Sequence, residues 1–278
     1  MKNLSLKNLF SLSLIVLLAA SCQENMPVIP DLTTISSNKK VIIEEFTGVA
    51  CVNCPAGSAE IESLLAQFPN NLIAVSIHTG NFARPYTSSK YDFRTEDGDR
   101  ITGDFFGEEP FSYPSAIIDR KKLGQGTHYV GQTSWAGHIV SEFAEGSPVS
   151  LALRKSYDSN SHTLDLEVDI LPLEDLPSDC RISILLTETG ISDYQLLPSP
   201  TGWKSDYTHK HVLRDIITNF DGDIITEPLT SGITVTKSFE YQLDEDWDAA
   251  KCEVIALVHR FTSDTKEVLQ AEKEHVAD

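Results

Sequence analysis

The chain has 278 residues and carries 41 acidic side chains against 22 basic ones, giving a formal net charge of −19 at pH 7. This excess of negative charge argues against binding to nucleic acid or to bare anionic lipid, because both repel an acidic surface. The length allows two domains, each with a hydrophobic core of its own.

The N-terminus, residues 1–21, is predicted to be a secretory signal peptide. It has a basic start and an apolar stretch at 9–20, which is too short for a comfortable membrane span. The sequence LAASC at its end resembles a bacterial lipobox, and this resemblance implies that Cys22 becomes the lipid-bearing first residue of the mature protein. Ordinary cleavage nearby, which would leave Cys22 as a free thiol, is the alternative. Residues 22–38 follow as a tether, because they contain two prolines and no apolar period.

Residues 39–146 alternate predicted strands and helices, which is typical of an α/β domain. A strand at 39–46 precedes a helix at 55–68, and the strand at 71–78 is apolar on both faces, as expected in the middle of a parallel sheet. Strand, helix and strand together make a βαβ unit. The other elements predicted in this region are a helix around 90–106, which the EDGD segment at 96–99 would interrupt, a strand at 115–123 and a helix at 133–146.

Residues 147–278 are predicted to form an all-β domain. The candidate strands lie at 149–157, 162–170, 180–190, 206–216, 232–243, 251–261 and 266–276. The second of these alternates strictly, with four aliphatic residues on one face and three acidic residues on the other. About seven antiparallel strands in a segment of this length predict an immunoglobulin-like or fibronectin-like β-sandwich.

Cys51 and Cys54 form a Cys-x-x-Cys motif between a predicted strand and a predicted helix. At a helix N-terminus, unpaired N–H groups and the helix dipole stabilise a thiolate and lower the thiol pKa from about 8.5 to about 3.5–7.5. The thiolate attacks a disulfide, and the second thiol resolves the mixed disulfide. Pro55 suits the first helical turn. The placement favours a redox pair, with an inert structural disulfide as the alternative.

No metal site and no cofactor are predicted. A structural zinc site needs four ligands, usually with a second closely spaced pair, and the sequence lacks that pair. His209 and His211 lie two apart on a predicted strand without a third ligand in view. The acidic stretches at 97–100 and 221–223 lack the spacing of a calcium loop, so turns are predicted there.

Two further cysteines and one histidine are also candidates for a role. Cys180 and Cys252 each stand at the start of an apolar strand, so they are a candidate for a second, structural disulfide. Buried free thiols are the alternative. His78 ends a predicted central strand and is either a proton donor or a structural histidine.

The segment EEFTGVACVNCPAG, residues 44–57, resembles the active-site segment of thioredoxin-like proteins. The resemblance implies that Glu45, six residues before Cys51, lies beneath the cysteine pair and helps to move a proton off Cys54. A solvated charge at the end of a strand is the alternative for Glu45.

The same resemblance extends to the segment FSYPSAIIDR. It implies that Pro114 follows a cis peptide bond and faces the cysteine pair. Tyr113 would then present its backbone to an incoming extended peptide. The dipeptide Val52-Asn53 between the two cysteines leaves the redox direction open.

The lipobox, the Cys-x-x-Cys segment, YPSAIIDR and DYTHKHVLR together resemble the twenty-eight-kilodalton outer-membrane lipoprotein family of Bacteroidetes. This resemblance implies a lipid-anchored protein of the outer membrane, facing the periplasm or the outside. It also implies a thioredoxin-like domain at 39–146 followed by the β-sandwich at 147–278. It implies no particular reaction.

Two functions remain open from the sequence. In the first, the protein exchanges thiols and disulfides with exported proteins through Cys51 and Cys54. In the second, the β-sandwich binds host or matrix proteins, and the cysteine pair is a static disulfide. In both, the lipid on Cys22 provides the contact with the membrane.

Overall fold

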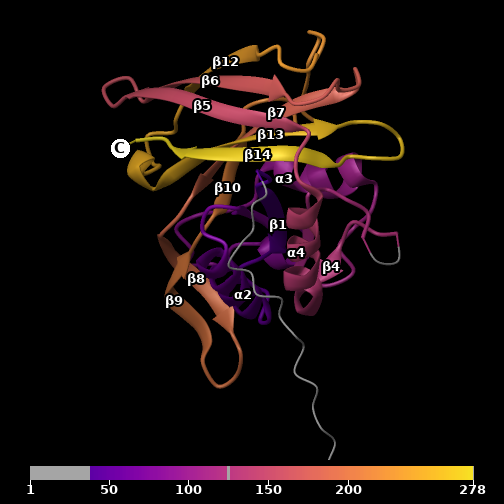
Figure 1. Ribbon diagram of the computed structural model, residues 1–278. Helices are drawn as coiled ribbons and strands as arrows, with labels where there is room; N and C mark the ends of the chain where they lie inside the picture. Colours follow the sequence, from indigo (N-terminus) through magenta and orange to yellow (C-terminus); the bar gives the residue numbers. More distant parts are fainter. Residues whose placement is uncertain (1–37, 124–125, 278) are drawn as a thin grey trace, which may run out of the picture. The chain divides into compact units, whose positions relative to one another are not determined.

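The computed structural model describes residues 38–123 and 126–277 (Figure 1). The predicted signal peptide, Cys22 and almost all of the predicted tether lie outside these residues, so the lipid anchor stays a prediction. Among the described residues, no helix has both the length and the apolar character needed to cross a bilayer.

The described chain begins with the predicted strand, helix and strand. These are β1 (Val41–Thr47), α2 (Cys54–Gln67) and β2 (Leu72–His78). β1 and β2 pair in parallel, and every residue of both strands is buried. A strand covered on both faces favours a near-continuous apolar run, which is the pattern that predicted a central position for β2.

The segment up to residue 146 continues with short elements. They are η2 (Asn81–Ala83), α3 (Glu96–Arg100), the π-helix η3 (Ile101–Phe106), β3 (Ser115–Ile118), β4 (Val130–Gly131), η4 (Gln132–Ser134) and α4 (Trp135–Glu145). The predicted turn at 97–100 is wrong, because Thr95 caps a helix there by accepting a hydrogen bond from the Gly98 N–H. β3 ends before Asp119 and Arg120, whose positive φ angles of 47° and 53° leave the extended conformation.

The remainder of the chain is almost entirely strands. They are β5 (Val149–Asp158), β6 (Thr163–Pro172), β7 (Cys180–Glu188), β8 (Ile191–Leu197), β9 (Gly202–His209), β10 (Val212–Ile216), β11 (Asp223–Ile224), β12 (Val235–Gln242), β13 (Cys252–Arg260) and β14 (Val268–His275), with η5 (Ala249–Lys251) before β13. β8 was not predicted. The strand predicted at 206–216 is two strands, because His211 has a φ of 53° and turns the chain between them.

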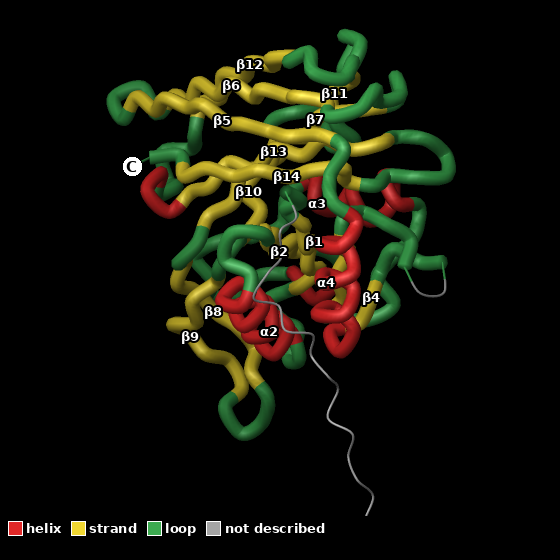
Figure 2. Tube along the Cα trace, in the orientation of Figure 1, coloured by secondary structure: helices red, strands yellow, loops and turns green. Residues whose placement is uncertain are grey.

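One nine-stranded sheet contains strands from both predicted domains (Figures 1 and 2). Its order is β14-β13-β7-β10-β2-β1-β3-β4, with β11 paired to β7. The strands of residues 39–146 and those of residues 147–278 are connected by the parallel pairing of β10 with β2, where Val212 lies opposite Ser76. The predicted boundary at 146–147 therefore does not separate two sheets. Hydrophobic periodicity indicates that a strand exists, but it does not indicate which strand lies beside it.

The strands β5, β6 and β12 form a second sheet in the order β12-β6-β5. This sheet lies across β7, β13 and β14 in Figure 1 and shares one apolar core with β7 and β13. The alternation predicted for 162–170 is confirmed, because its four aliphatic residues are all buried in that core. β8 and β9 pair only with each other and form a hairpin beside α2 (Figure 1).

Candidate functional site

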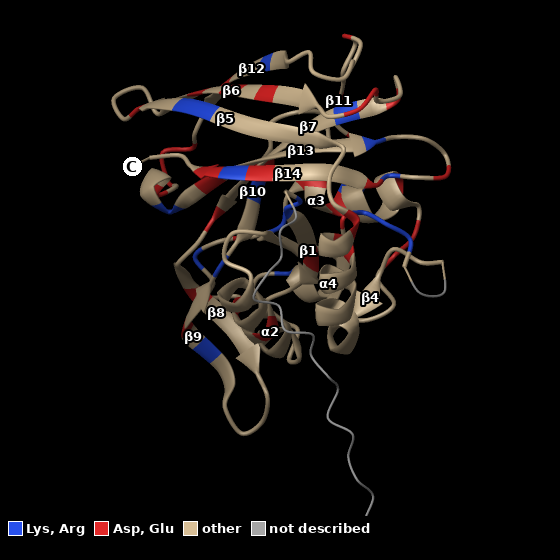
Figure 3. Ribbon diagram, viewed as in Figure 1, with Lys and Arg blue, Asp and Glu red and all other residues tan. Residues whose placement is uncertain are grey.

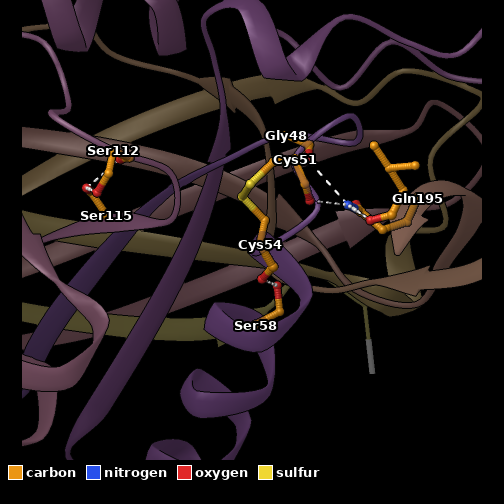
Figure 4. Close-up of a disulfide and its surroundings, with 8 residues drawn as sticks. Gly48, Cys51, Cys54, Ser58, Ser112, Ser115 and Gln195 are labelled. Atoms are coloured by element: carbon orange, nitrogen blue, oxygen red, sulfur yellow. Dashed lines mark hydrogen bonds between the residues drawn. A yellow bond between two sulfur atoms is a disulfide. The ribbon is translucent and has the colours of Figure 1, made fainter. Parts of the chain in front are cut away.

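Cys51 and Cys54 form a disulfide at the start of α2, with their Cα atoms 5.4 Å apart (Figure 4). Cys54 is the first residue of the helix, and its N–H donates to the Cys51 carbonyl at 3.3 Å. Cys51 and Cys54 are only 3% and 1% exposed, whereas Val52 and Asn53 between them lie on the surface. The disulfide therefore sits just beneath the surface of the turn.

The first turn of α2 has the electrostatics that favour a thiolate. No side chain caps the helix N-terminus, and no acidic residue lies in the first turn. Figure 3 colours acidic residues red, and those of α2, Glu60 and Glu62, come later in the helix. The positive end of the helix dipole therefore acts on the cysteine pair without an acidic side chain in the same turn to oppose it. Such a position lowers the pKa of a free thiol.

Glu45 lies beneath this first turn and is completely buried. A Cβ atom on Gly57 would be 2.6 Å from Glu45 Oε1, so the glycine allows the helix to rest directly on the carboxyl group. Burial raises the pKa of Glu45 to about 8, although the Ser76 hydroxyl donates a hydrogen bond to Oε2 at 3.2 Å and opposes the rise. Glu45 Oε1 has no hydrogen-bond partner. The alternative of a solvated strand-end charge is wrong.

Pro114 also lies against Gly57, at the place where the helix approaches Glu45. The Tyr113–Pro114 peptide bond is cis, as the resemblance to thioredoxin-like proteins implied. Pro114 Cγ would be 2.8 Å from a Cβ atom on Gly57, so the proline, the helix and Glu45 meet at one point. The ring of Tyr113 packs on Phe82 with centroids 5.5 Å apart, and burial raises the pKa of its hydroxyl to about 12.

A hairpin distant in sequence contacts the cysteine turn. Gln195 on β8 donates from Nε2 to the Cys51 carbonyl at 3.1 Å and to the Gly48 carbonyl at 3.4 Å (Figure 4). The backbone N–H of Leu196 donates to the Val49 carbonyl at 2.8 Å. Gln195 was not among the predicted site residues, because an uncharged residue on an unpredicted strand carries no local signal of a site.

A pocket of about 400 Å³ lies between α2 and β9. Its lining includes Ser58 and Glu62 from α2, Ser76 and His78 from β2, and Gln195, Lys204, Tyr207 and His209 from the hairpin. Burial lowers the pKa of His78 to about 3 and that of His209 to about 4, so both are neutral near pH 7. His78 Nδ1 is buried without a hydrogen-bond partner.

His209 and His211 do not share a ligand position. His209 Nε2 contacts the Tyr194 carbonyl at 3.2 Å, whereas His211 Nε2 contacts Glu62 Oε1 at 3.0 Å. The turn between β9 and β10 separates the two side chains. Within the two described stretches of the chain, no group of three histidine, cysteine or acidic residues is placed to hold a metal ion.

Of the two possibilities for Cys180 and Cys252, the second disulfide is wrong and the alternative of buried free thiols is confirmed. β7 and β13 are neighbours, but they are antiparallel, with Cys180 opposite Arg260 and Cys252 opposite Glu188. The starts of two antiparallel strands lie at opposite ends of the pair. Eight residues of strand separate the two cysteines by about 27 Å, far beyond the reach of a disulfide.

Comparison with known proteins identifies the family. A family model described as outer membrane protein Omp28 matches residues 110–278, which is more than half of the chain. The chain belongs to the Omp28 family. The family places the protein at the outer membrane, in agreement with the resemblance found in the sequence. The matched part of this Omp28 family member contains Tyr113 and Pro114 but begins after the cysteine pair.

Solved structures show the same fold at low sequence identity. HBP35 of Porphyromonas gingivalis is 16% identical, has a TM-score of 0.61, and the match covers 86% of this chain and 75% of that one. A crystal structure of a protein from Agrobacterium tumefaciens is 14% identical, has a TM-score of 0.52, and the match covers 84% and 93%. Among curated proteins, none matches the sequence.

Proposed function

We propose that this Omp28 family member exchanges thiols and disulfides with exported proteins through Cys51 and Cys54. The observation that carries the proposal is the position of the disulfide at the uncapped start of α2, above the buried carboxyl group of Glu45. A cysteine pair that only stabilises the fold has no need of a titratable group beneath it. Perturbed carboxyl groups beside a reactive pair are typical of catalytic sites.

The fold of the region around the disulfide supports the same proposal. The part of the sheet with the order β2-β1-β3-β4 has β1 parallel to β2 and antiparallel to β3, and α2 follows the cysteine pair. With Pro114 before β3, this arrangement supports our assignment of the region to a thioredoxin-like unit. We assign residues 147–278 to a β-sandwich that shares its larger sheet with this unit, in place of a separate domain.

The exchange starts from the reduced pair. The Cys51 thiolate attacks one sulfur of a client disulfide, and the other client sulfur leaves as a thiolate. Cys54 then gives its proton to Glu45 and attacks the Cys51 sulfur, which releases the second client sulfur. The client gains two electrons and takes two protons from water, and the protein keeps the Cys51–Cys54 disulfide. A dithiol donor restores the reduced pair by the same steps in reverse.

A second candidate function rests on the burial of the cysteines. Cysteine residues that are only 3% and 1% exposed also suit a disulfide that is never exchanged. In that case the β-sandwich would bind host or matrix proteins. The lipid on Cys22 would hold the protein at the membrane under either function, and Cys22 lies outside the described residues.

The reduction potential of the pair decides between these functions. We would equilibrate residues 23–278, which contain the compact unit Ser36–Asp278, with glutathione buffers. A potential between about −120 and −270 mV is expected for an exchanging pair, and one below about −300 mV would establish a structural disulfide. Burial raises the pKa of Cys180 to about 11 and that of Cys252 to about 12, so these thiols do not compete.

Trapping of clients provides the matched test in cells. Cys54→Ser leaves the attacking thiol and removes the resolving one, so mixed disulfides with exported proteins should accumulate. Cys51→Ser removes the attacking thiol, and it should trap none. Equal trapping by both variants would contradict the assigned roles of Cys51 and Cys54.

A further inference from the structure

We propose that Glu45 exchanges its proton with solvent through the Ser76 hydroxyl and the pocket between α2 and β9. The inference rests on the proposed function, because only thiol-disulfide exchange requires Glu45 to gain and lose a proton in each cycle. It assigns a role to Ser76 and to the hairpin that forms the outer wall of the pocket.

A polar strip on the sheet connects Glu45 with the pocket. The parallel register of β1 and β2 places Glu45 beside Ser76 and Thr47 beside His78. Alternate residues of a strand share a face, so these four side chains point towards α2. The intervening residues on the opposite face, including Phe46 and Ile77, are apolar and belong to a buried core. Ser76, Thr47 and His78 all line the pocket, and Ser76 donates to Glu45 Oε2 at 3.2 Å.

The two ends of the strip carry buried polar atoms without partners. Glu45 Oε1 and His78 Nδ1 make no hydrogen bond, although buried polar atoms almost always have a protein or water partner. A pocket of about 400 Å³ has room for several water molecules, each of which takes about 30 Å³ in the liquid. Water in the pocket would hydrogen-bond to Ser76 and His78, which line it, and would connect these side chains to bulk solvent.

The proposed route leaves Glu45 on the side of β2, where the Ser76 hydroxyl hydrogen-bonds to its carboxyl group. On the side of α2, Gly57 lies so close to the carboxyl group that even a Cβ atom on residue 57 would clash with Glu45 Oε1. The Glu45 side chain itself has no exposed surface. A proton must therefore pass through a neighbouring polar group, and Ser76 is the side chain that hydrogen-bonds to Glu45.

Several titratable groups lie along the route beside Glu45. The groups concerned are Cys54 and Glu62 on α2, His78 on β2, Lys204, Tyr207 and His209 on β9, and Lys210 and His211 in the following turn. Hydrogen bonds from His211 and Lys210 lower the pKa of Glu62 to about 2, so Glu62 stays ionised. His78 and His209 stay neutral, and burial raises the pKa of Tyr207.

Glu45 must lose its proton along this route before it can act as a base. Its pKa of about 8 means that most molecules hold a proton on Glu45 at pH 7. That proton has to leave before the carboxylate can accept the one on Cys54. The resolving step should therefore become faster as the pH rises through about 8.

The test separates the two cysteine steps in time. Reduced residues 23–278 are mixed with the dithiobis-nitrobenzoate disulfide in a stopped-flow instrument. Attack by Cys51 releases the first coloured thiolate, and resolution by Cys54 releases the second. The variants Ser76→Val and Ser76→Thr introduce side chains of the same shape, but only the threonine side chain keeps a hydroxyl group. At pH 7 we expect Ser76→Val to slow the second release by about tenfold or more, and Ser76→Thr to keep it near the rate of the unchanged chain.

Equal second-phase rates for Ser76→Val and Ser76→Thr would overturn the proton route. Absence of a fast first phase in the unchanged chain would instead contradict the proposed function, so the two failures are distinguishable. A second pair of variants tests the pocket if Ser76→Val does not fold. Ala59→Trp fills the pocket from its α2 wall and should slow the second release, whereas Ala66→Trp, on an exposed part of the same helix away from the pocket, should not. Identical rates for these two would also overturn the route.

Discussion

Among the residues of the site, Glu45 couples the stability of the fold to pH. Burial raises its pKa from 4.5 to about 8, so the folded chain holds a proton that the unfolded chain releases between these values. Folding therefore binds a proton in this range. The contribution of Glu45 to the free energy of unfolding must fall as the pH rises from 4.5 to about 8, and it levels off above that.

Glu45→Gln keeps the side-chain volume and removes this titration. We expect the variant and the unchanged chain to have similar stability at about pH 4, and the variant to be more stable at about pH 9 by on the order of a few kcal/mol. Thermal unfolding across this range measures the difference. A constant difference at every pH would show that Glu45 does not change protonation on folding.

Gly57 allows the helix to approach the carboxyl group and the proline. A Cβ atom there would be 2.6 Å from Glu45 Oε1 and 2.8 Å from Pro114 Cγ. Gly57→Ala should therefore destabilise the fold by about 1–3 kcal/mol through overpacking, despite the better helix propensity of alanine. Gly137→Ala on α4 is the control, because its added Cβ meets no atom within 4 Å and should stabilise the fold by about 0.5–1 kcal/mol. Denaturant unfolding of both variants tests the expectation, and effects of the same sign would contradict it.

At the scale of elements, the β8–β9 hairpin holds the cysteine turn in place. Gln195→Met keeps the volume of the side chain and removes the donor to the Cys51 and Gly48 carbonyls. Leaving these carbonyls unpaired should destabilise the fold by about 1–3 kcal/mol. The loosened turn should also let dithiothreitol reduce the buried disulfide several-fold faster. Ser192→Ala, at an exposed position on the same strand, should change neither quantity. Unchanged reduction in Gln195→Met would show that the hairpin does not limit access.

The elements that were predicted correctly are those whose sequence patterns lie within the elements themselves. β1, α2 and β2 have apolar runs of the right period, and the cysteine motif with Pro55 indicates where the helix begins. Ser76 could have been found from the same pattern, because a parallel pairing of the two predicted strands brings it beside Glu45. The break between β9 and β10 could not, because the positive φ of His211 depends on its tertiary surroundings.

At the scale of the whole molecule, the shared sheet predicts that the first region cannot fold alone. Leu213 of β10 and Ile255 and Leu257 of β13 pack in the same apolar core as Ile42 and Phe46 of β1. Residues 23–146 expressed alone should therefore lack a cooperative thermal transition by circular dichroism, whereas residues 23–278 should show one. The exposed edge of β2 and the uncovered core would also promote aggregation of the shorter chain. Cooperative unfolding of residues 23–146 would restore the original expectation of two independent domains.

The sequence by itself determined the local features of this protein: the strand–helix–strand unit, the cysteine pair at the helix start, and the alternation of β6. These depend on residues a few positions apart, whose periodicity and turn chemistry are visible in one chain. Only the tertiary structure decided that β10 joins β2, that Gln195 holds the Cys51 carbonyl, and that Cys180 and Cys252 lie far apart. The physical reason is that strand order and register are set by the packing of distant segments into a common core. Many arrangements of the same strands satisfy the same hydrophobic pattern.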